Sequence, residues 1–154
     1  MPDVIVISGP NGAGKSTLAP HLLRDALGIV EFVNADTIAQ GLSAFAPELA
    51  AIQAGRIMLR RLDELSESNH NFAFETTLSS LSFARRITIQ QSKGYRVQLI
   101  YLWLNAAELA VARVKERVRM GGHDIPDETI RRRYERGRRN FLDIYQPLVD
   151  AWKV

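Results

Sequence analysis

Residues Gly9–Thr17 read GPNGAGKST and follow the apolar run Val4–Ile7. This segment satisfies the pattern G-x-x-x-x-G-K-[ST] of a phosphate-binding loop. Its glycines permit the backbone angles that turn successive N–H groups toward phosphate oxygens, and the helix that follows adds its positive end. We expect Lys15 to reach the β- and γ-phosphates of a nucleoside triphosphate and the Ser16 hydroxyl to bind Mg²⁺. The residues expected to contact the nucleotide are Gly9, Asn11, Gly12, Ala13, Gly14, Lys15, Ser16 and Thr17.

A carboxylate, Asp36, lies 21 residues after Lys15, at the end of the second predicted strand. In a phosphoryl-transfer enzyme this position faces the γ-phosphate from the side of the acceptor. Asp36 is therefore a candidate general base that takes the proton of an acceptor hydroxyl and orients it for in-line attack. The alternative is a structural role, because aspartate is also a favoured N-cap residue and a helix toward Gly41 follows.

Glu75 is the only charged residue in the segment NFAFETTL and ends the third predicted strand. An acid at this place can bind Mg²⁺ through water or hold a sugar hydroxyl. It can equally be a solvated strand end or a cap for the next helix. Thr76 and Thr77 are candidates for hydrogen bonds to substrate, although threonine also serves in turns. We expect these three residues, with Asp36, to form the substrate side of the site.

Arginines concentrate in residues 113–139, a segment that holds ten Lys/Arg and five Asp/Glu and so carries a net charge of +5. Two predicted helices flank a Gly-Gly-His loop here. This is the layout of a lid, at about residues 117–135, that closes over nucleotide and excludes water. Arginines in a lid stabilise charge on a transferring phosphoryl group. We expect Arg119 and one or two of residues 131–133, Arg132 first, to do this, while the other arginines form a solvated basic face.

The run RRRYERGRR allows a second interpretation, a nucleic-acid-binding patch with Tyr134 interleaved. We favour it less, because the run is short, contains Glu135, and belongs to a chain whose net charge is only +3. His123, in the loop of the predicted lid, has no second histidine at metal-ligand spacing, so a zinc site is not predicted. We expect His123 to contact nucleotide or substrate, or to cap the next helix.

Strands and helices alternate along the chain, which predicts an α/β fold with a parallel sheet of about 4–5 strands flanked by helices. Ligands bind such sheets outside the carboxyl ends of the strands, where the phosphate loop, Asp36 and Glu75 all fall. The predicted strands are Asp3–Ser8, Ile29–Asn34, Phe72–Glu75 and Tyr95–Leu104, with the start of another in Val149–Val154. The predicted helices are Ser16–Leu27, residues 36–41, Pro47 to about Asn69, Ser79 or Ser80 to Gln91, Ala106–Arg119, and Pro126 to about Tyr145.

The length of 154 residues, with 46% apolar and 24% charged residues, predicts a single globular domain that spans residues 1–154. The chain has no cysteine, which excludes disulfides and thiolate metal sites. Its first residues lead directly into a strand without the pattern of a signal peptide. No apolar stretch approaches the roughly 18 to 20 residues that span a bilayer. We therefore expect a cytoplasmic protein that does not enter the membrane.

Four segments together resemble the zeta toxin family of P-loop kinases, and more narrowly its small stand-alone members in bacteria. In chain order they are GPNGAGKST, NADTIAQGL, FETTLS and RVRMGGHDIPDETIRRRYERGRRNF. The resemblance covers nearly the whole chain and implies a P-loop NTPase fold of the kinase type with a helical lid. It also implies a kinase that uses ATP and Mg²⁺, with Asp36 as catalytic base. Family members phosphorylate the 3′-hydroxyl of the amino sugar in UDP-N-acetylglucosamine, so a nucleotide sugar is the expected acceptor and an antitoxin protein a candidate partner.

The competing hypothesis is a P-loop ATPase without a small-molecule acceptor, associated with nucleic acid. A kinase needs a base aimed at an acceptor hydroxyl, whereas an ATPase needs a polarised water, so Asp36 favours the kinase.

The resemblance also assigns roles to single residues. The positions that match functional residues of the family are Lys15 and Ser16 for ATP and Mg²⁺, Glu75, Thr76 and Thr77 for the substrate pocket, and Arg119 with Arg132 or Arg133 for the paired phosphate-binding arginines.

Overall fold

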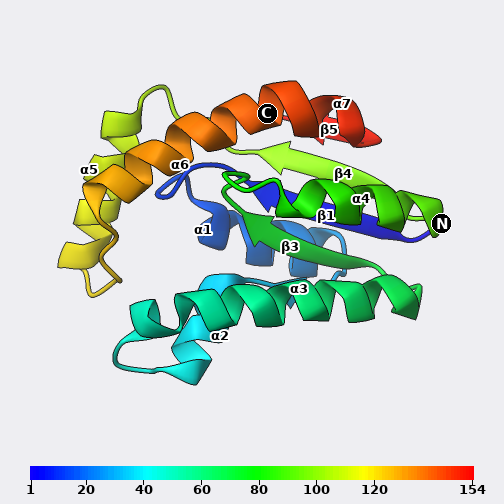
Figure 1. The fold of residues 1–154 in the computed structure, drawn as a ribbon, viewed down its shortest axis with the longest axis horizontal. Coiled ribbons are helices and arrows are strands. Elements are labelled where there is room, and N and C mark those ends of the chain that lie inside the picture. Colours follow the sequence, from blue (N-terminus) through cyan, green and yellow to red (C-terminus); the bar gives the residue numbers. More distant parts are fainter.

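The computed structural model describes residues 1–154 as one five-stranded sheet flanked by helices (Figure 1). The strands lie in the order β2-β3-β1-β4-β5, and all neighbouring pairs are parallel. Both faces of β1 are apolar because both are covered by helices, as is usual for parallel sheets. The predicted α/β fold is therefore confirmed. The strands are β1 (Asp3–Ser8), β2 (Phe32–Val33), β3 (Phe72–Thr76), β4 (Arg96–Tyr101) and β5 (Ala151–Lys153).

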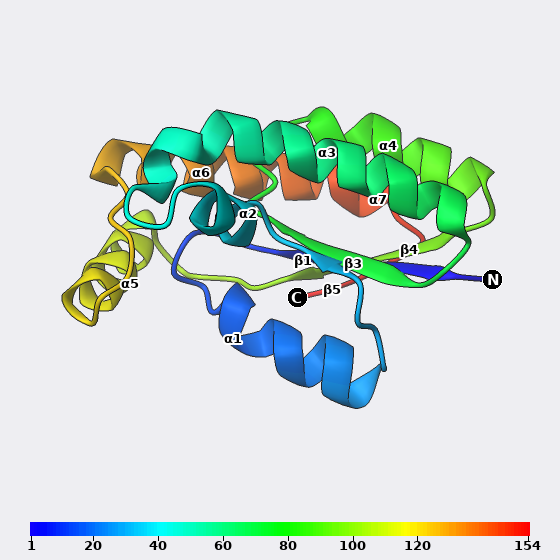
Figure 2. The same ribbon diagram turned by 90° about the horizontal axis from the view of Figure 1, so that it is seen from below.

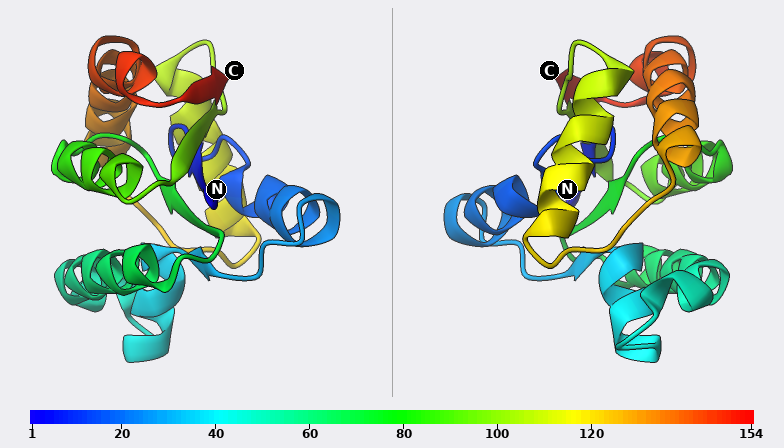
Figure 3. Two further views of the ribbon diagram at one scale, coloured as in Figure 1. Left: turned by 90° about the vertical axis from the view of Figure 1, so that its right-hand side faces the viewer. Right: turned by 90° about the vertical axis from the view of Figure 1, so that its left-hand side faces the viewer.

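Helices cover the two faces unequally. α1 (Lys15–Ala19) and its π-helical continuation η1 (Pro20–Ala26) lie on one face, and α3, α4, α6 and α7 lie on the other (Figure 2). The end-on views of Figure 3 show the same division, with blue α1 on one side and green α4 and orange-red α6–α7 on the other. No helix is both long enough and apolar enough to cross a membrane. The helices after η1, including those named above, have these bounds: α2 (Ala35–Leu42), η2 (Pro47–Ala50), α3 (Ala51–Ser68), α4 (Ser82–Ser92), α5 (Ala107–Arg119), α6 (Asp127–Asn140), η3 (Phe141–Tyr145) and α7 (Gln146–Leu148).

Separate apolar clusters hold these layers together. The largest contains 17 buried residues and joins the sheet to α3, α4 and η3, with Phe74 and Leu62 as fully buried members. A second, on the face of α1, includes Ile7 and Leu23. A third joins α5 to α6 through residues such as Tyr134. The predicted lid segment, residues 117–135, is thus the end of α5, a loop and the start of α6, and the α5–α6 hairpin has a small core of its own.

The second strand is shorter than the predicted Ile29–Asn34, because Asn34 serves the next helix instead. The Asn34 side-chain oxygen accepts the N–H groups of Asp36, at 2.8 Å, and Thr37, at 3.4 Å. These bonds satisfy two of the free N–H groups at the start of α2, which is the work of an N-cap. The capping role considered for Asp36 therefore belongs to Asn34.

Other predicted bounds shift for local reasons. The helix expected from Pro47 begins as the 3₁₀ turn η2, and β4 ends at Tyr101 rather than Leu104. The helix expected from Ser79 or Ser80 begins at Ser82, after Leu78 takes a left-handed conformation with φ 60°. Beyond Pro20, the helix after the phosphate loop continues with π-helical hydrogen bonds, because proline has no N–H to donate.

The last long helix crosses directly over the loop that follows β3. A Cβ at Gly137 would lie 2.2 Å from the Thr77 carbonyl oxygen, so only glycine permits this approach. Asn140 donates from its side-chain amide to the Leu78 carbonyl at 2.8 Å, and the Tyr145 hydroxyl donates to the Ser80 carbonyl at 2.6 Å. The helix that begins in the predicted lid therefore also fixes the loop after β3.

Candidate active site

The phosphate loop follows β1 and is shaped by glycines at close contacts. Gly9, Gly12 and Gly14 have φ values of 143°, 81° and 96°, which side-chain-bearing residues rarely adopt. A Cβ on Gly9 would lie 2.6 Å from the Leu102 carbonyl oxygen, and one on Gly12 would lie 3.0 Å from the Arg113 Cβ of α5. The loop thus fits between the chain leaving β4 and α5, and its conformation suits a cradle of backbone N–H groups.

Lys15 is buried at the centre of this loop, with only 7% of its surface exposed. Its ammonium group donates to the carbonyl oxygens of Gly9, at 2.8 Å, and Pro10, at 3.0 Å. Burial lowers the pKa of Lys15 to about 8, while the nearby carboxylates of Glu75 and Asp36 act in the opposite direction. Both candidate acids therefore act electrostatically on the phosphate-binding lysine.

Glu75 is the last residue but one of β3 and lies beside the end of β1, since it pairs in register with Ile7. Its carboxylate accepts a hydrogen bond of 2.8 Å from the side-chain amide of Asn34. Burial raises the pKa of Glu75, while the Lys15 ammonium and the Ser16 hydroxyl oppose this rise. A carboxylate and a hydroxyl that lie together next to a phosphate cradle are the oxygen ligands that Mg²⁺ prefers.

Asp36 lies in the first turn of α2 and is exposed. Its carboxylate accepts no hydrogen bond and belongs to no ion pair, while its backbone N–H is held by Asn34. Its charge nevertheless acts on the pKa values of Lys15 and Arg133, which places it near both. Asp36 is therefore positioned by its backbone and free at its carboxylate, as a group that accepts a proton from substrate must be.

One cavity of about 390 Å³ brings together six of the predicted site residues, among them Lys15, Asp36 and Glu75. Catalytic candidates from the phosphate loop, α2 and β3 lie on it with residues of α3, α4 and α6. Its size is within the range usual for small-molecule sites. The lining residues are Asn11, Lys15, Asn34, Ala35, Asp36, Ile52, Gly55, Arg56, Met58, Leu59, Glu75, Thr76, Thr77, Ser79, Ser80, Ser82, Phe83 and Arg133.

The two predicted threonines line the cavity but also stabilise its loop. The Thr76 hydroxyl accepts the backbone N–H of Leu78 at 3.0 Å, and the hydroxyls of Thr77 and Ser79 are 2.9 Å apart. Both the substrate-side and the turn role remain compatible with this geometry. His123, by contrast, is exposed in the loop between α5 and α6 and does not line the cavity.

Of the lid arginines, the structure brings Arg133 rather than Arg132 into the cavity. Arg133 is half-buried and donates to the Asn11 side-chain oxygen at 3.5 Å, and burial lowers its pKa. Arg132 is exposed and lies outside the lining. Arg119 points away, in an ion pair of 3.0 Å with Glu116. Arg117, two residues before Arg119 in α5, instead acts on the pKa values of Lys15 and Glu75.

Packing patterns in the sequence contain the signals for these differences. Ile130, Tyr134 and Gly137 form the buried stripe of α6, and Arg133 lies next to that stripe, three residues after Ile130. On α5, Gly12 packs against Ala110 and Arg113, so Arg117, four residues after Arg113, continues the face toward the phosphate loop. Asn34 directly precedes the helix and is a favoured N-cap type.

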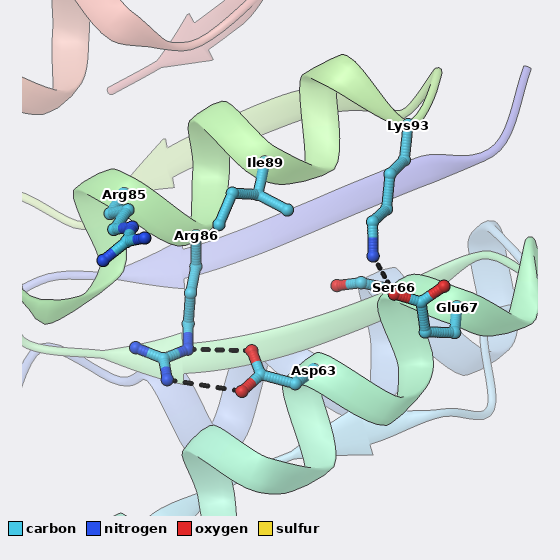
Figure 4. A pocket seen from close by; sticks show the side chains of 7 residues that line it. All are labelled: Asp63, Ser66, Glu67, Arg85, Arg86, Ile89 and Lys93. Carbon is cyan, nitrogen blue, oxygen red and sulfur yellow. Dashed lines mark hydrogen bonds and ion pairs between the residues drawn. The ribbon is translucent and has the colours of Figure 1, made fainter.

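A second hollow lies between α3 and α4, away from these groups (Figure 4). Four of its five charged side chains pair across the two helices, Arg86 with Asp63 at 3.0 Å and Lys93 with Glu67, whereas Arg85 forms no ion pair. The paired groups therefore satisfy one another instead of converging on a ligand, and the hollow is a seam between helices.

Solved structures share this fold at low sequence identity. A chain of the PezAT chromosomal toxin–antitoxin system of Streptococcus pneumoniae is 18% identical with a TM-score of 0.71, covering 99% of this chain and 68% of that one. Shikimate kinase from Acinetobacter baumannii in complex with shikimate is 18% identical with a TM-score of 0.61, covering 100% and 83%. These likenesses establish a P-loop kinase fold.

Sequence comparisons identify the family. An uncharacterized protein of Haemophilus influenzae is 36% identical over 130 residues, which cover 84% of this chain and 91% of that protein. The family model described as "Zeta toxin" matches residues 1–149. Together with the fold, this match supports a kinase-like phosphotransferase. The chain belongs to the zeta toxin family.

Proposed function

We propose that this protein is a kinase that uses ATP and Mg²⁺ to phosphorylate a hydroxyl of a nucleotide sugar such as UDP-N-acetylglucosamine. The observation that carries the proposal is the unpartnered Asp36 carboxylate, which shares one cavity with Lys15 and Arg133. A base on the acceptor side of the phosphate loop is a requirement of phosphoryl transfer to an alcohol. Family membership and the P-loop kinase fold support the same reaction class.

The donor side fits ATP and its metal ion. The positive-φ glycines leave backbone N–H groups free to bind phosphate oxygens, and Lys15 supplies the cation at the centre of the loop. Ser16 and Glu75 would hold Mg²⁺, which when bound neutralises charge on the β- and γ-phosphates. In place of Arg132 and Arg119, we assign Arg133 and Arg117 as the arginines that act on the transferring group.

The transfer step follows from these positions. The acceptor hydroxyl oxygen forms a bond to the γ-phosphorus while the bond from that phosphorus to the bridging oxygen of ADP breaks. Asp36 takes the hydroxyl proton, and Arg133 stabilises the charge that develops on the phosphoryl oxygens. Thr77 and Ser79 orient the acceptor through their hydroxyls. The part of this cavity that is lined by α3 holds the rest of the acceptor.

The family also suggests a partner. A solved relative is a chain of a toxin–antitoxin system, so we propose that an antitoxin protein binds this chain as well.

The proposed reaction is tested by offering ATP labelled at the γ-phosphate with a panel of nucleotide sugars and free sugars. We expect label in one nucleotide sugar, and none in that product when Asp36→Asn replaces the wild type. Label found only as free phosphate, at a rate unaffected by any acceptor, would support the competing ATPase and sink the kinase.

A further inference from the structure

The acceptor half of the cavity contains one cation that the reaction described above does not use. Three cationic side chains line the cavity: Lys15, Arg133 and Arg56. Lys15 and Arg133 both contact the phosphate loop, through its carbonyl oxygens and through Asn11. Arg56 comes from α3 instead and makes no hydrogen bond to the phosphate loop. It is therefore the one cation of the lining that the phosphate loop does not hold.

Arg56 has no partner within the protein. It forms no ion pair, although Arg61 on the same helix is paired with both Glu31 and Glu64. Its guanidinium also makes no hydrogen bond to any backbone or side-chain oxygen, whereas Arg86 on the neighbouring helix makes three. The five donors of Arg56 are thus available to a ligand, and a planar guanidinium binds phosphate oxygens in pairs.

The surface around Arg56 is open and suited to an elongated ligand. Gly55 lines the cavity beside it, and a Cβ at Gly55 would meet no heavy atom within 4 Å. Ile52 and Leu59 lie four residues before and three residues after Arg56 and give the same helix face an apolar lining. Ser80, from the loop between β3 and α4, also lines the cavity and adds a hydroxyl. A ligand lying here has apolar and hydroxyl contacts along it and a single positive charge to meet.

We propose that Arg56 binds a phosphate group of the acceptor and so selects phosphorylated acceptors, such as sugar phosphates and nucleotide sugars, over neutral sugars. The inference rests on the proposed kinase function and adds to it a specificity-determining residue. Lys15 and Arg133 are held at the phosphate loop beside Asp36 and Glu75, whereas Arg56 is unpaired on α3, so an acceptor whose phosphate binds Arg56 is oriented along the cavity. Its hydroxyl then lies at Asp36 and its phosphate at Arg56.

The test measures binding without turnover. Wild type, Arg56→Gln and the control Arg60→Gln are saturated with a non-hydrolysable ATP analogue and Mg²⁺, which blocks the phosphate loop. Each is titrated calorimetrically with UDP-N-acetylglucosamine, N-acetylglucosamine 1-phosphate and N-acetylglucosamine. Arg60 is a suitable control because it is exposed, lies one turn further along α3, and does not line the cavity.

We expect wild type and Arg60→Gln to bind the two phosphorylated ligands more tightly than the neutral sugar. Arg56→Gln should bind the phosphorylated ligands about 10- to 100-fold more weakly than wild type, because it lacks one charge-assisted contact. Affinity of Arg56→Gln for the neutral sugar should change less than about 2-fold. Equal binding of charged and neutral ligands by wild type, an unchanged Arg56→Gln, or no binding of any of the three would overturn the proposal. Transfer of labelled phosphate by wild type to any acceptor would still leave the kinase function standing.

Discussion

Asp36 is exposed and unpartnered, although it lies close to Lys15 and Arg133. A structural aspartate would be expected to cap its helix, but here Asn34 does so, with bonds to the N–H groups of Asp36 and Thr37. The cap holds the backbone of Asp36 and leaves its carboxylate free. At the scale of single residues, this combination of a fixed backbone and a free carboxylate makes Asp36 the candidate base.

Replacement of Asp36 by asparagine should lower the rate of acceptor phosphorylation by about 10²- to 10⁴-fold, the usual contribution of a general base. ATP affinity should change little, because the phosphate loop is intact. Steady-state rates with saturating ATP measure the effect. The control Glu48→Gln removes a nearby exposed carboxylate that does not line the cavity, and it should retain full activity. An Asp36→Asn enzyme with wild-type kcat would leave the residue without a catalytic role.

Lys15 should make ATP binding depend on pH. Burial lowers its pKa to about 8, so the ammonium form is present below this pH and is lost above it. Bound phosphates favour the ammonium form and raise the pKa in the complex. ATP affinity should therefore fall as pH rises through about 8, with a proton taken up on binding just above that pH.

Proton uptake is measured by calorimetry in buffers of different ionisation enthalpy. Lys15→Met should bind ATP more weakly and take up no proton in this range. Equal uptake by the variant would show that another group titrates, and an affinity constant across the range would contradict the role of the lysine charge.

At the scale of elements, α6 joins the two halves of the site. Its buried stripe packs on α5, Arg133 beside that stripe reaches Asn11, and Gly137 lies against the loop after β3. One helix therefore connects Arg133, on the proposed donor side, with the loop after β3, whose hydroxyls lie on the proposed acceptor side. Displacing α6 should therefore affect both Arg133 and the loop after β3.

Gly137→Ala tests this contact. The added Cβ would lie 2.2 Å from the Thr77 carbonyl oxygen, which is backbone and cannot rotate away. We expect a loss of about 1–3 kcal/mol in the free energy of unfolding, as for other overpacked sites, together with a higher KM for the acceptor. Denaturant titration and steady-state kinetics measure the two effects.

Gly41→Ala provides the matched control, since α2 leaves nothing within 4 Å of a Cβ there. It should gain about 0.5–1 kcal/mol, because alanine is the better helix residue. A Gly137→Ala protein as stable and as active as wild type would show that α6 does not constrain the loop.

The sequence was sufficient where function depends on local pattern. Gly9, Gly14 and Lys15 are fixed by one contiguous motif, and the alternation of elements predicted the parallel sheet. It was insufficient where a choice among similar residues depends on which helix face is buried. Arg132 and Arg133 differ only in their angle to the stripe that begins at Ile130, and the run of three arginines does not itself show which of them lies beside that stripe. Asn34 and Asp36 are both favoured N-cap types, so residue type alone does not separate them.

At the scale of the whole molecule, strand order brings the chemistry together. β3 lies between β2 and β1, so the residues that follow these three strands meet at one edge of the sheet. Glu75 is in register with Ile7, and Asn34, which follows β2, donates to Glu75 at 2.8 Å. The edge therefore places the phosphate loop and two carboxylates around one cavity, as the proposed transfer between a donor and an acceptor requires.

The most direct test of this account is the ratio of phosphorylated acceptor to ADP formed in a single turnover. Enzyme in excess of labelled ATP is mixed with Mg²⁺ and the nucleotide sugar, and both products are quantified over time. A kinase with a water-excluding site should form one phosphorylated acceptor for each ADP. ADP should form far more slowly when the acceptor is omitted. ADP that forms at the same rate with or without acceptor, accompanied by free phosphate, would contradict the account.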